Sequence, residues 1–318
     1  MITGSMIETA YKRIQPFIVR TPLLRCPALD GDLGCQVYLK LENLQRTGSF
    51  KIRGALSRLT LLSETEKKKG VVCASSGNHA IALAMAAAEM GVASTVIMPE
   101  TVHPYKHQLV SAYASQVLYT GKLSSERNAK AREMAEAGLT LVHSHADPHV
   151  IAGQGTIGIE LLEDSAELDH VLIPVGGGGL ISGISTVVKA RQPAIQIVGV
   201  EPAGAPRYGL SRNEGSPVVL DTVQTIADGT RCDHANPDNF LMIENNVDIL
   251  VTASEAAIKK AVGLLALKGK VVAEPSSSLP IAAILDGSYA VKSTERVAFV
   301  VTGGNIDPSL FTSLLQDA

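Results

Sequence analysis

Residues 40–55 read Lys-Leu-Glu-Asn-Leu-Gln-Arg-Thr-Gly-Ser-Phe-Lys-Ile-Arg-Gly-Ala, and the rest of the chain is organised around this stretch. Within it, Lys51 follows an apolar residue and a Thr-Gly-Ser turn, whereas most other lysines have charged or polar neighbours. A lysine that loses water has a lowered amine pKa, so its neutral, nucleophilic form becomes available near neutral pH. Lys51 is therefore a candidate covalent nucleophile. The alternative is a surface lysine that follows a turn.

The composition limits the class of protein. A chain of 318 residues, of which 46% are hydrophobic, is long enough for about two domains with a large core. A net charge of -3 and an aromatic content of 4% argue against nucleic acid as a partner. No apolar run is long enough to span a bilayer and no signal peptide is recognisable, so we expect no membrane partner. Because the four cysteines have no Cys-x-x-Cys spacing, we expect a reducing, cytoplasmic location.

Predicted strands alternate with predicted helices along most of the chain. Hydrophobic patterning predicts strands at residues 37–41, 71–74, 94–98, 116–119, 139–142, 171–175, 196–200, 247–251 and 297–301. It predicts helices at 7–18, 52–62, 79–90, from Pro104 onward, and at 124–137, 153–162, 180–191, 254–267 and 280–285. Such alternation implies parallel sheets, so we expect an α/β fold with two lobes. We place a small domain at 69–147 and a large domain at 1–68 and 148–318.

Two turns between a strand and a helix are predicted to bind anions. The first, Ser-Ser-Gly-Asn at residues 75–78, follows strand 71–74 and opens an alanine-rich helix. The second is the run of four glycines at 176–179, which follows strand 171–175. Backbone amides and a helix amino terminus favour a carboxylate or a phosphate at such places. For the glycines, a tight turn that only packs a helix on a strand is the alternative.

Other catalytic patterns are weak or missing from the sequence. The glycine run has neither the spacing of a dinucleotide fingerprint nor the lysine and hydroxyl of a P-loop, although a compact monophosphate would fit. His143, His145 and His149 are close in sequence, but no cysteine or carboxylate has tetrahedral spacing with them, which favours a polar loop over a metal site. Neither the Gly-x-Ser-x-Gly elbow nor the His-Glu-x-x-His helix occurs.

Taken together, these features resemble a known family, the fold-type II pyridoxal-phosphate enzymes, in the branch of threonine/serine dehydratases (threonine ammonia-lyases) and serine racemases. Four segments carry the resemblance: Ser-Phe-Lys-Ile-Arg-Gly-Ala at 49–55, Ser-Ser-Gly-Asn-His at 75–79, Gly-Gly-Gly-Gly-Leu at 176–180 and Thr-Gly-Gly-Asn at 302–305. Residues 152–156 and 227–229 are similar to the same branch. The resemblance covers the chain from about residue 7 and implies a tryptophan synthase β-like fold, with pyridoxal 5'-phosphate in the cleft between the lobes.

The resemblance implies roles for the cofactor-binding residues. Lys51 would hold the cofactor aldehyde as a Schiff base and then act as the general base at Cα. Phe50 would pack near the ring, and Asn78 would donate a hydrogen bond to its phenolic oxygen. Thr302 would face the pyridine nitrogen. The phosphate would be bound by Gly176, Gly177, Gly178 and Gly179.

The same resemblance implies how an amino-acid substrate is bound. Its carboxylate would be received by the first anion turn, which consists of Ser75, Ser76, Gly77, Asn78 and His79. Ser76 is also a candidate catalytic residue, because racemases of this branch have an acid/base on the opposite face at this position. We further expect a homo-oligomer, either a dimer or a tetramer.

Thr302 favours one type of reaction. An aspartate there would keep the pyridine nitrogen protonated, whereas a neutral hydroxyl makes the ring a weaker electron sink and favours expulsion of a β-hydroxyl. The predicted activity is therefore dehydration and deamination of L-threonine or L-serine to a 2-oxo acid and ammonia. Serine racemase and 3-hydroxyaspartate dehydratase are the alternatives within the family. A non-catalytic binder of a phosphorylated small molecule is the alternative from another class, although a binder has no need of a desolvated lysine.

The chain departs from this branch in two loops. Residues 201–207 read Glu-Pro-Ala-Gly-Ala-Pro-Arg, where the branch often has a glutamate followed by a second acidic ligand for a divalent cation. Because Arg207 replaces that acid, we expect no metal site, with Glu201 as the one possible ligand. Residues 274–278, Glu-Pro-Ser-Ser-Ser, replace a more usual version with glycine and alanine. The chain ends directly after the catalytic lobe, so we expect no regulatory domain and no feedback control by isoleucine.

Overall fold

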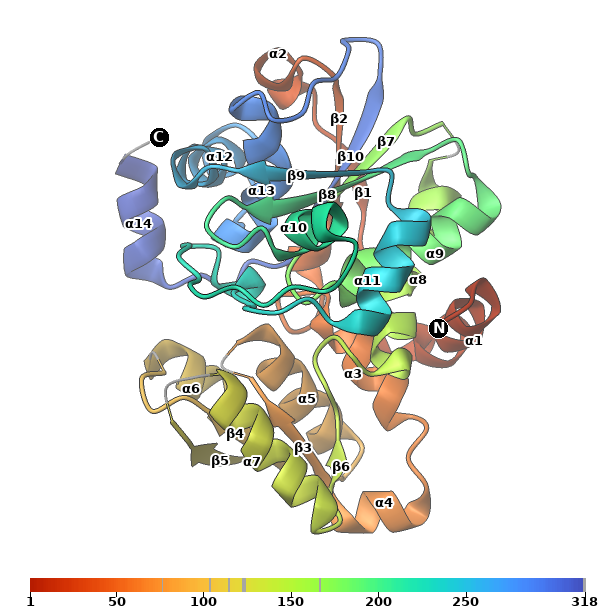
Figure 1. The fold of residues 1–318 in the computed structure, drawn as a ribbon, viewed down its shortest axis with the longest axis vertical. Helices are drawn as coiled ribbons and strands as arrows, with labels where there is room; N and C mark the ends of the chain where they lie inside the picture. The colour runs from red at the N-terminus through yellow and green to blue at the C-terminus, as the bar shows by residue number, and fades with distance from the viewer. Residues whose placement is uncertain (76, 103, 114, 122–123, 166, 317–318) are drawn as a thin grey trace.

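Two sheets organise the computed structural model, which describes residues 1–75, 77–102, 104–113, 115–121, 124–165 and 167–316 (Figure 1). The larger sheet has six strands in the order β1-β2-β10-β7-β8-β9. Its strands are β1 (Leu23–Arg25), β2 (Gln36–Leu41), β7 (His170–Pro174), β8 (Gln196–Pro202), β9 (Ile249–Ala253) and β10 (Arg296–Val301). All neighbours pair in parallel except β1 and β2, which are antiparallel. The carboxyl ends of β2, β7, β8, β9 and β10 therefore meet at one edge.

The smaller sheet lies in the other half of the molecule, the lower half of Figure 1. Its order is β5-β4-β3-β6, and every pair is parallel. The strands are β3 (Val71–Ala74), β4 (Ser94–Met98), β5 (Gln116–Tyr119) and β6 (Thr140–Leu141). All four come from one continuous segment of the chain, whereas the larger sheet is built from residues on both sides of it.

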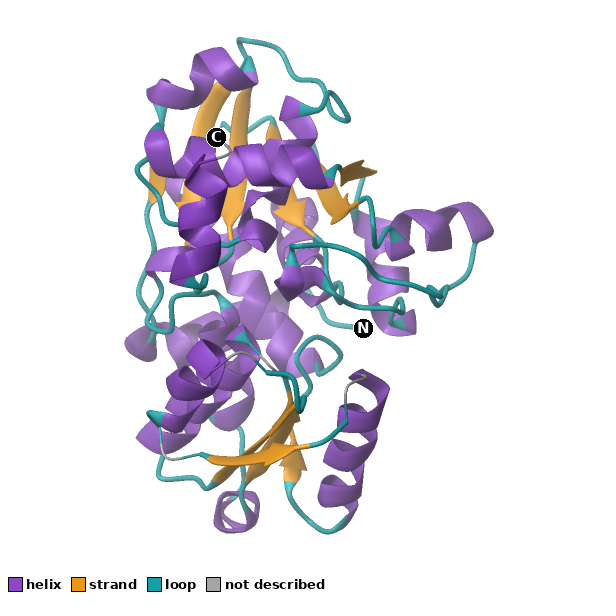
Figure 2. Ribbon diagram, turned by 90° about the vertical axis from the view of Figure 1, so that its left-hand side faces the viewer, coloured by secondary structure: helices purple, strands orange, loops and turns teal. Residues whose placement is uncertain are grey.

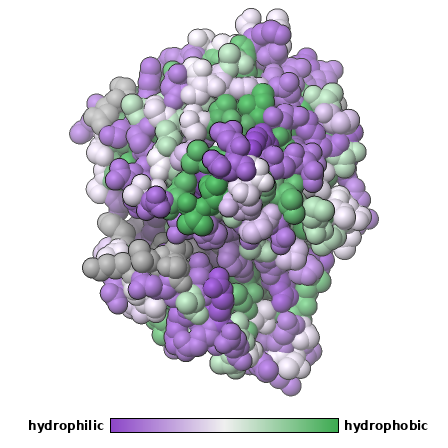
Figure 3. All heavy atoms as spheres, in the orientation of Figure 1, coloured by the Kyte–Doolittle hydropathy of each residue, from purple (hydrophilic) through white to green (hydrophobic). Residues whose placement is uncertain are grey.

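Helices cover both sheets, as Figure 2 shows from the side. They are α1 (Gly4–Ile14), α2 (Asp30–Leu33), α3 (Lys51–Leu59), α4 (Glu64–Lys69), α5 (Asn78–Glu89), α6 (Pro104–Ser111), α7 (Ser124–Glu136), α8 (Pro148–Asp164), α9 (Gly179–Arg191), α10 (Arg207–Glu214), α11 (Pro237–Asn246), α12 (Glu255–Leu267), α13 (Pro275–Leu285) and α14 (Pro308–Gln316). Short 3-10 turns are η1 (Gln15–Phe17), η2 (Pro27–Leu29), η3 (Glu42–Leu44) and η4 (Asp228–Thr230). The face drawn in Figure 3 is mostly hydrophilic, with hydrophobic side chains in a few patches. Among the described helices, none combines the length and the apolar character that crossing a membrane requires.

Glycines on the surface of helix α8 set the position of Lys51 relative to the four-glycine run. A Cβ atom on Gly153 would lie 2.5 Å from the carbonyl oxygen of Arg53 in α3, and one on Gly155 would lie 2.8 Å from that of Gly183 in α9. Both separations are too short for any side chain, so α3 and α9 approach α8 backbone to backbone. Lys51 begins α3 and the four-glycine run ends at the start of α9, so this packing sets their relative position.

The expected α/β architecture with parallel sheets is confirmed, and three strands (β3, β4 and β5) have the predicted bounds. Several helix bounds were wrong. Helix α8 begins at Pro148 rather than 153, because the Asp147 side chain caps it by accepting from the amides of His149 and Val150. Helix α13 begins at Pro275 and continues through Pro280, and α4, α10, α11 and α14 were not predicted. The proposed domain boundaries stay a prediction.

Candidate functional site

A cavity of about 190 Å³ lies where the two sheets face each other. It is bordered by the ends of three parallel strands, at Ala74 in β3, Pro174 in β7 and Thr302 after β10. The carboxyl ends of parallel strands are the usual location of ligands in α/β proteins. Eleven of the predicted site residues line this cavity: Phe50, Lys51, Ser75, Gly77, Asn78, His79, Gly176, Gly177, Gly178, Gly179 and Thr302. The twelfth, Ser76, lies outside the described residues.

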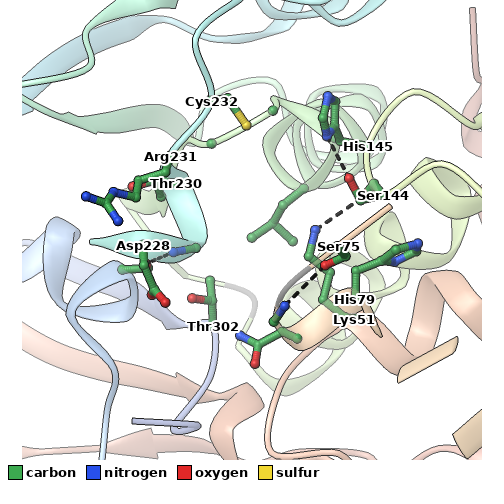
Figure 4. Close-up of a pocket in the computed structure, with 18 of the residues that line it drawn as sticks. Lys51, Ser75, His79, Ser144, His145, Asp228, Thr230, Arg231, Cys232 and Thr302 are labelled. Carbon is green, nitrogen blue, oxygen red and sulfur yellow. Dashed lines mark hydrogen bonds between the residues drawn. The ribbon is translucent and has the colours of Figure 1, made fainter. Parts of the chain in front are cut away.

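Lys51 is the first residue of α3, and its amine faces the cavity (Figure 4). Its Nζ donates a hydrogen bond to the carbonyl oxygen of Ser144 at 3.2 Å and lies 4.9 Å from the centre of the Phe50 ring. Loss of water lowers the pKa of Lys51 to about 8, although Cys232 and Glu274 act in the opposite direction. About a tenth of the amine is therefore neutral at pH 7, whereas an ordinary lysine is neutral in less than about one part in a thousand.

A buried ion network anchors the helix that carries Lys51. Arg53, two residues further along α3, is fully buried and donates to both carboxylate oxygens of Glu42 and of Glu160, at 2.7 to 2.8 Å. Lys40 donates to the same Glu160 carboxylate at 2.6 Å. Two buried cations and two buried anions therefore pair with one another, and Lys40 also lies 3.7 Å from the partly exposed Asp164 carboxylate. This network was not predicted, although Lys40 and Glu42 are charged residues in an otherwise apolar stretch and were a signal for it.

The four-glycine run has the geometry of an anion cradle. The amides of Gly176, Gly177 and Gly178 donate to no acceptor in the described part of the chain. The Gly177 carbonyl accepts from the Tyr208 hydroxyl at 2.9 Å and from the Asn239 side chain at 2.7 Å. In a trans peptide the C=O and the next N–H point in opposite directions. The two contacts that hold the Gly177 carbonyl therefore turn the Gly178 amide toward the cavity. The helix dipole of α9 adds partial positive charge at the same point.

Two positions of this loop leave no room for a side chain. A Cβ on Gly177 would lie 2.2 Å from the His145 ring, and one on Gly178, which has φ +85°, would lie 2.6 Å from the Tyr208 hydroxyl. Glycine is thus required here by close packing as well as by backbone conformation.

The first anion turn faces the cavity with backbone groups rather than with a charged ring. The Gly77 amide donates to the Ser75 hydroxyl at 3.3 Å, and α5 begins at Asn78. The His79 ring is buried and its Nε2 bonds the Val142 carbonyl at 2.9 Å. Burial lowers the pKa of His79 to about 3, so the ring is neutral at physiological pH. His79 can therefore attract a carboxylate through its helix-terminal amide but not through a ring charge.

Two polar side chains of the site are held by residues that the sequence analysis did not assign. Asn78 donates to the Glu274 carboxylate at 2.7 Å and accepts from the Asn305 amide at 2.8 Å. The Thr302 hydroxyl lies 2.9 Å from the Ser277 hydroxyl. Burial, reinforced by the nearby Asp228, raises the pKa of Glu274 to about 8, so this carboxyl is protonated at neutral pH. The unusual loop at 274–278 therefore contributes directly to the site.

Of the candidate metal ligands, His143 and His145 line the cavity, whereas His149 and Glu201 are not among its lining residues. No group of three or more histidine, cysteine, aspartate or glutamate side chains converges within the described ranges. The rings of His143 and His145 contact each other at 4.6 Å, and burial lowers the pKa of His143 to about 4. The Glu201 carboxylate accepts from the amides of Tyr208 and Gly209 at 3.0 and 2.8 Å.

Comparison with known proteins gives the family. The family described as "Pyridoxal-phosphate dependent enzyme" matches residues 14–303. The chain is 38% identical over 317 residues to an L-threonine ammonia-lyase of Thermotoga maritima, covering 99% of this chain and 79% of the relative. It is also 38% identical to an L-threo-3-hydroxyaspartate ammonia-lyase of a Pseudomonas species, covering 96% of each. The structure of maize serine racemase is similar with a TM-score of 0.93 and 32% identity, over 99% of this chain and 97% of that one. This chain belongs to the family of pyridoxal-phosphate-dependent enzymes.

Proposed function

We propose that the protein dehydrates and deaminates L-threonine or L-serine, yielding a 2-oxo acid and ammonia. The observation that carries this proposal is the pairing, in one cavity, of an amine of lowered pKa at Lys51 with the unpartnered amides of the glycine loop. The similarity to an L-threonine ammonia-lyase over nearly the whole chain supports it. Membership of an enzyme family argues against a non-catalytic binder.

The residues of the cavity fit pyridoxal phosphate. Three unpartnered amides on a loop that leaves no room for a Cβ at Gly177 and Gly178 are suited to a phosphate group. Lys51 offers a neutral amine for the aldehyde, and Phe50 offers an apolar surface for the ring. Thr302 would face the ring nitrogen with a hydroxyl that Ser277 orients. We propose that these residues hold the cofactor.

The chain's own residues would each have a separate role in the reaction. Pyridoxal phosphate, when bound, supplies the electron sink for bond cleavage at Cα. Lys51 would accept the Cα proton, which its lowered pKa allows near neutral pH. The first anion turn, Ser75 to His79, would bind the substrate carboxylate at the amino terminus of α5. A role for Ser76 as an acid/base on the opposite face is kept as a prediction.

A second candidate substrate is L-threo-3-hydroxyaspartate. One relative with this activity in its name is as similar as the threonine ammonia-lyase. The cavity is also lined by Lys106, which is paired with Asp228, and by Arg127 and Arg231, and cationic groups of this kind can bind a second carboxylate. Racemisation of serine is the third possibility, suggested by the name of the maize structure.

One assay separates these substrates. The purified protein, loaded with pyridoxal phosphate, is given L-threonine, L-serine or L-threo-3-hydroxyaspartate, and 2-oxo acid and ammonia are measured. The proposal expects equal amounts of both products from threonine or serine. Chiral chromatography of the remaining serine measures racemisation. If only hydroxyaspartate yields product, or only D-serine forms, the dehydration proposal for threonine and serine is wrong.

We also propose a cytoplasmic location and a homo-oligomer of two or four chains. The support for the location is that all four cysteines are free, three of them buried in the core. Light scattering coupled to size-exclusion chromatography measures the oligomeric state, and a monomer at micromolar concentration would contradict the second part.

A further inference from the structure

Arg207 is one of the two largest fully buried side chains, and all of its donors are used. Nε and Nη2 donate to the Gly176 carbonyl at 3.0 and 2.7 Å, and Nη2 also donates to the Val175 carbonyl at 2.8 Å. Nη1 donates to the carbonyls of Ala205 and Cys232, both at 3.0 Å. A guanidinium has five N–H groups, so each one has a backbone oxygen as its acceptor.

Two of these acceptors belong to the glycine cradle. The Val175 carbonyl is in the same peptide unit as the Gly176 amide, and the Gly176 carbonyl is in the same unit as the Gly177 amide. Because C=O and N–H point in opposite directions in a trans peptide, Arg207 fixes the orientation of both amides from behind the loop. These are two of the three amides of the glycine run, at Gly176 to Gly178, for which the described chain supplies no acceptor.

The charge of Arg207 is balanced by Glu201. Its carboxylate is buried and lies 3.8 Å from Nη2, while it accepts hydrogen bonds from the amides of Tyr208 and Gly209. Four carbonyl oxygens and one carboxylate therefore surround the guanidinium carbon. Such a set of oxygen atoms is the type that binds Mg²⁺ or Ca²⁺.

We infer that Arg207 is a fixed internal cation that positions the phosphate-binding loop, in the place where an exchangeable divalent cation would otherwise be needed. An arginine stays charged at every physiological pH and cannot dissociate from the chain. The protein should therefore hold its cofactor without a divalent cation. This inference rests on the proposed function, in that the loop is taken to bind the cofactor phosphate.

The test measures the affinity of the cofactor-free protein for pyridoxal phosphate and for pyridoxal, which has no phosphate, by absorbance titration. We expect Arg207→Gln to weaken binding of pyridoxal phosphate by about 10- to 100-fold, the usual cost of losing charged hydrogen bonds. Binding of pyridoxal should change less than about twofold, because it does not use the loop. A purely structural defect would instead weaken both. Arg207→Lys, which keeps the charge with fewer donors, should bind more tightly than Arg207→Gln.

Two further arms address the cation. EDTA should leave the wild-type affinity unchanged. Arg207→Asp should bind pyridoxal phosphate weakly in EDTA and recover in millimolar Mg²⁺ or Ca²⁺, since the new carboxylate joins Glu201 and the carbonyls. Arg207→Gln should not recover. Arg212→Gln is the matched control, because Arg212 is on the same helix but donates to Glu244, Ile243 and Val247, away from the loop.

The inference is overturned if wild-type affinity falls in EDTA and returns with Mg²⁺, or if folded Arg207→Gln binds pyridoxal phosphate as the wild type does. Circular dichroism checks folding. If Arg207→Gln and Arg207→Asp do not fold, the wild-type affinity measured in EDTA and the affinity of Arg207→Lys decide the question. Wild-type protein that binds no pyridoxal phosphate at all would overturn the proposed function together with this inference. Binding that is merely indifferent to Arg207 overturns the inference alone.

Discussion

Replacing Arg53 with leucine should destabilise the protein strongly, because Arg53 is the buried cation that pairs with both Glu42 and Glu160. Arg53 makes four hydrogen bonds of 2.7 to 2.8 Å to Glu42 and Glu160, and its removal leaves two buried carboxylates with Lys40 as the single cation. Removing one partner of a buried pair typically costs about 3–5 kcal/mol, since the remaining charge is left uncompensated. At about 2 °C per kcal/mol for a chain of this size, we expect a fall in Tm of about 6–10 °C.

The assay is thermal unfolding of the cofactor-free protein, with Arg191→Leu as the matched control. Arg191 pairs with Glu8 at 2.7 Å on the surface, and such pairs contribute about 1 kcal/mol or less. If Arg53→Leu lowers Tm no more than this control does, the buried network does not stabilise the fold as we describe.

The effect of Arg53→Leu on Tm should also depend on pH. Burial alone would raise the pKa of Glu42, but the attraction of Arg53 outweighs it and the pKa lies below its ordinary value. Without Arg53 the pKa of the Glu42 carboxyl should rise. Protonation of Glu42 at lower pH then removes an uncompensated buried charge and stabilises the folded variant. The Tm difference between wild type and Arg53→Leu should therefore narrow as the pH falls from 7 to 4, and a constant difference would contradict the explanation.

Three further predictions concern the cavity. Gly177→Ala should weaken pyridoxal phosphate binding by at least about tenfold, because the new Cβ would lie 2.2 Å from the His145 ring and must displace the loop; unchanged affinity in an absorbance titration would show that the loop adapts. The rate at which cofactor-free protein captures pyridoxal phosphate should rise with pH, reach half its maximum near pH 8, where Lys51 is half neutral, and level off above about pH 9; a rise that is still steep at pH 10 would indicate an ordinary lysine. Glu274→Gln should be more heat-stable than the wild type by a margin that grows between pH 5 and pH 8 and then stays constant. With a pKa of about 8, Glu274 keeps a proton in the folded protein that the unfolded chain releases near the ordinary value of 4.5. Folding of the wild type therefore becomes less favourable as the pH rises between these two values. A stability margin that does not change with pH would refute this prediction.

Local patterns in the sequence predicted the α/β architecture, and together with the family resemblance they predicted eleven residues that line the cavity. Each strand-turn-helix unit is a short continuous segment, so hydrophobic runs and turn residues are enough to locate it. The residues that hold the site are different. Arg53, Glu274 and Arg207 reach partners far away in the chain, and only the packed structure brings those partners within hydrogen-bonding distance.

Arg207 shows the limit most clearly. The family resemblance implied that it replaces an acidic cation ligand, but not where its guanidinium lies. Its acceptors come from residues 175, 176, 205 and 232, and no periodicity connects these positions. His79 is a second case, because its place in a predicted carboxylate-binding turn did not reveal that its ring is buried against Val142.

The central claim is that Lys51 carries the chemistry of a β-hydroxy amino acid dehydratase. Its most direct test compares 2-oxo acid formation from L-threonine and L-serine by the wild type, by Lys51→Ala and by Lys268→Ala, which removes an exposed lysine paired with Asp32. We predict that the wild type and Lys268→Ala form 2-oxo acid at similar rates, and that Lys51→Ala forms none and has lost the visible absorbance of covalently attached pyridoxal phosphate. Sustained product formation by Lys51→Ala, or no product from either substrate with the cofactor-loaded wild type, would contradict the claim.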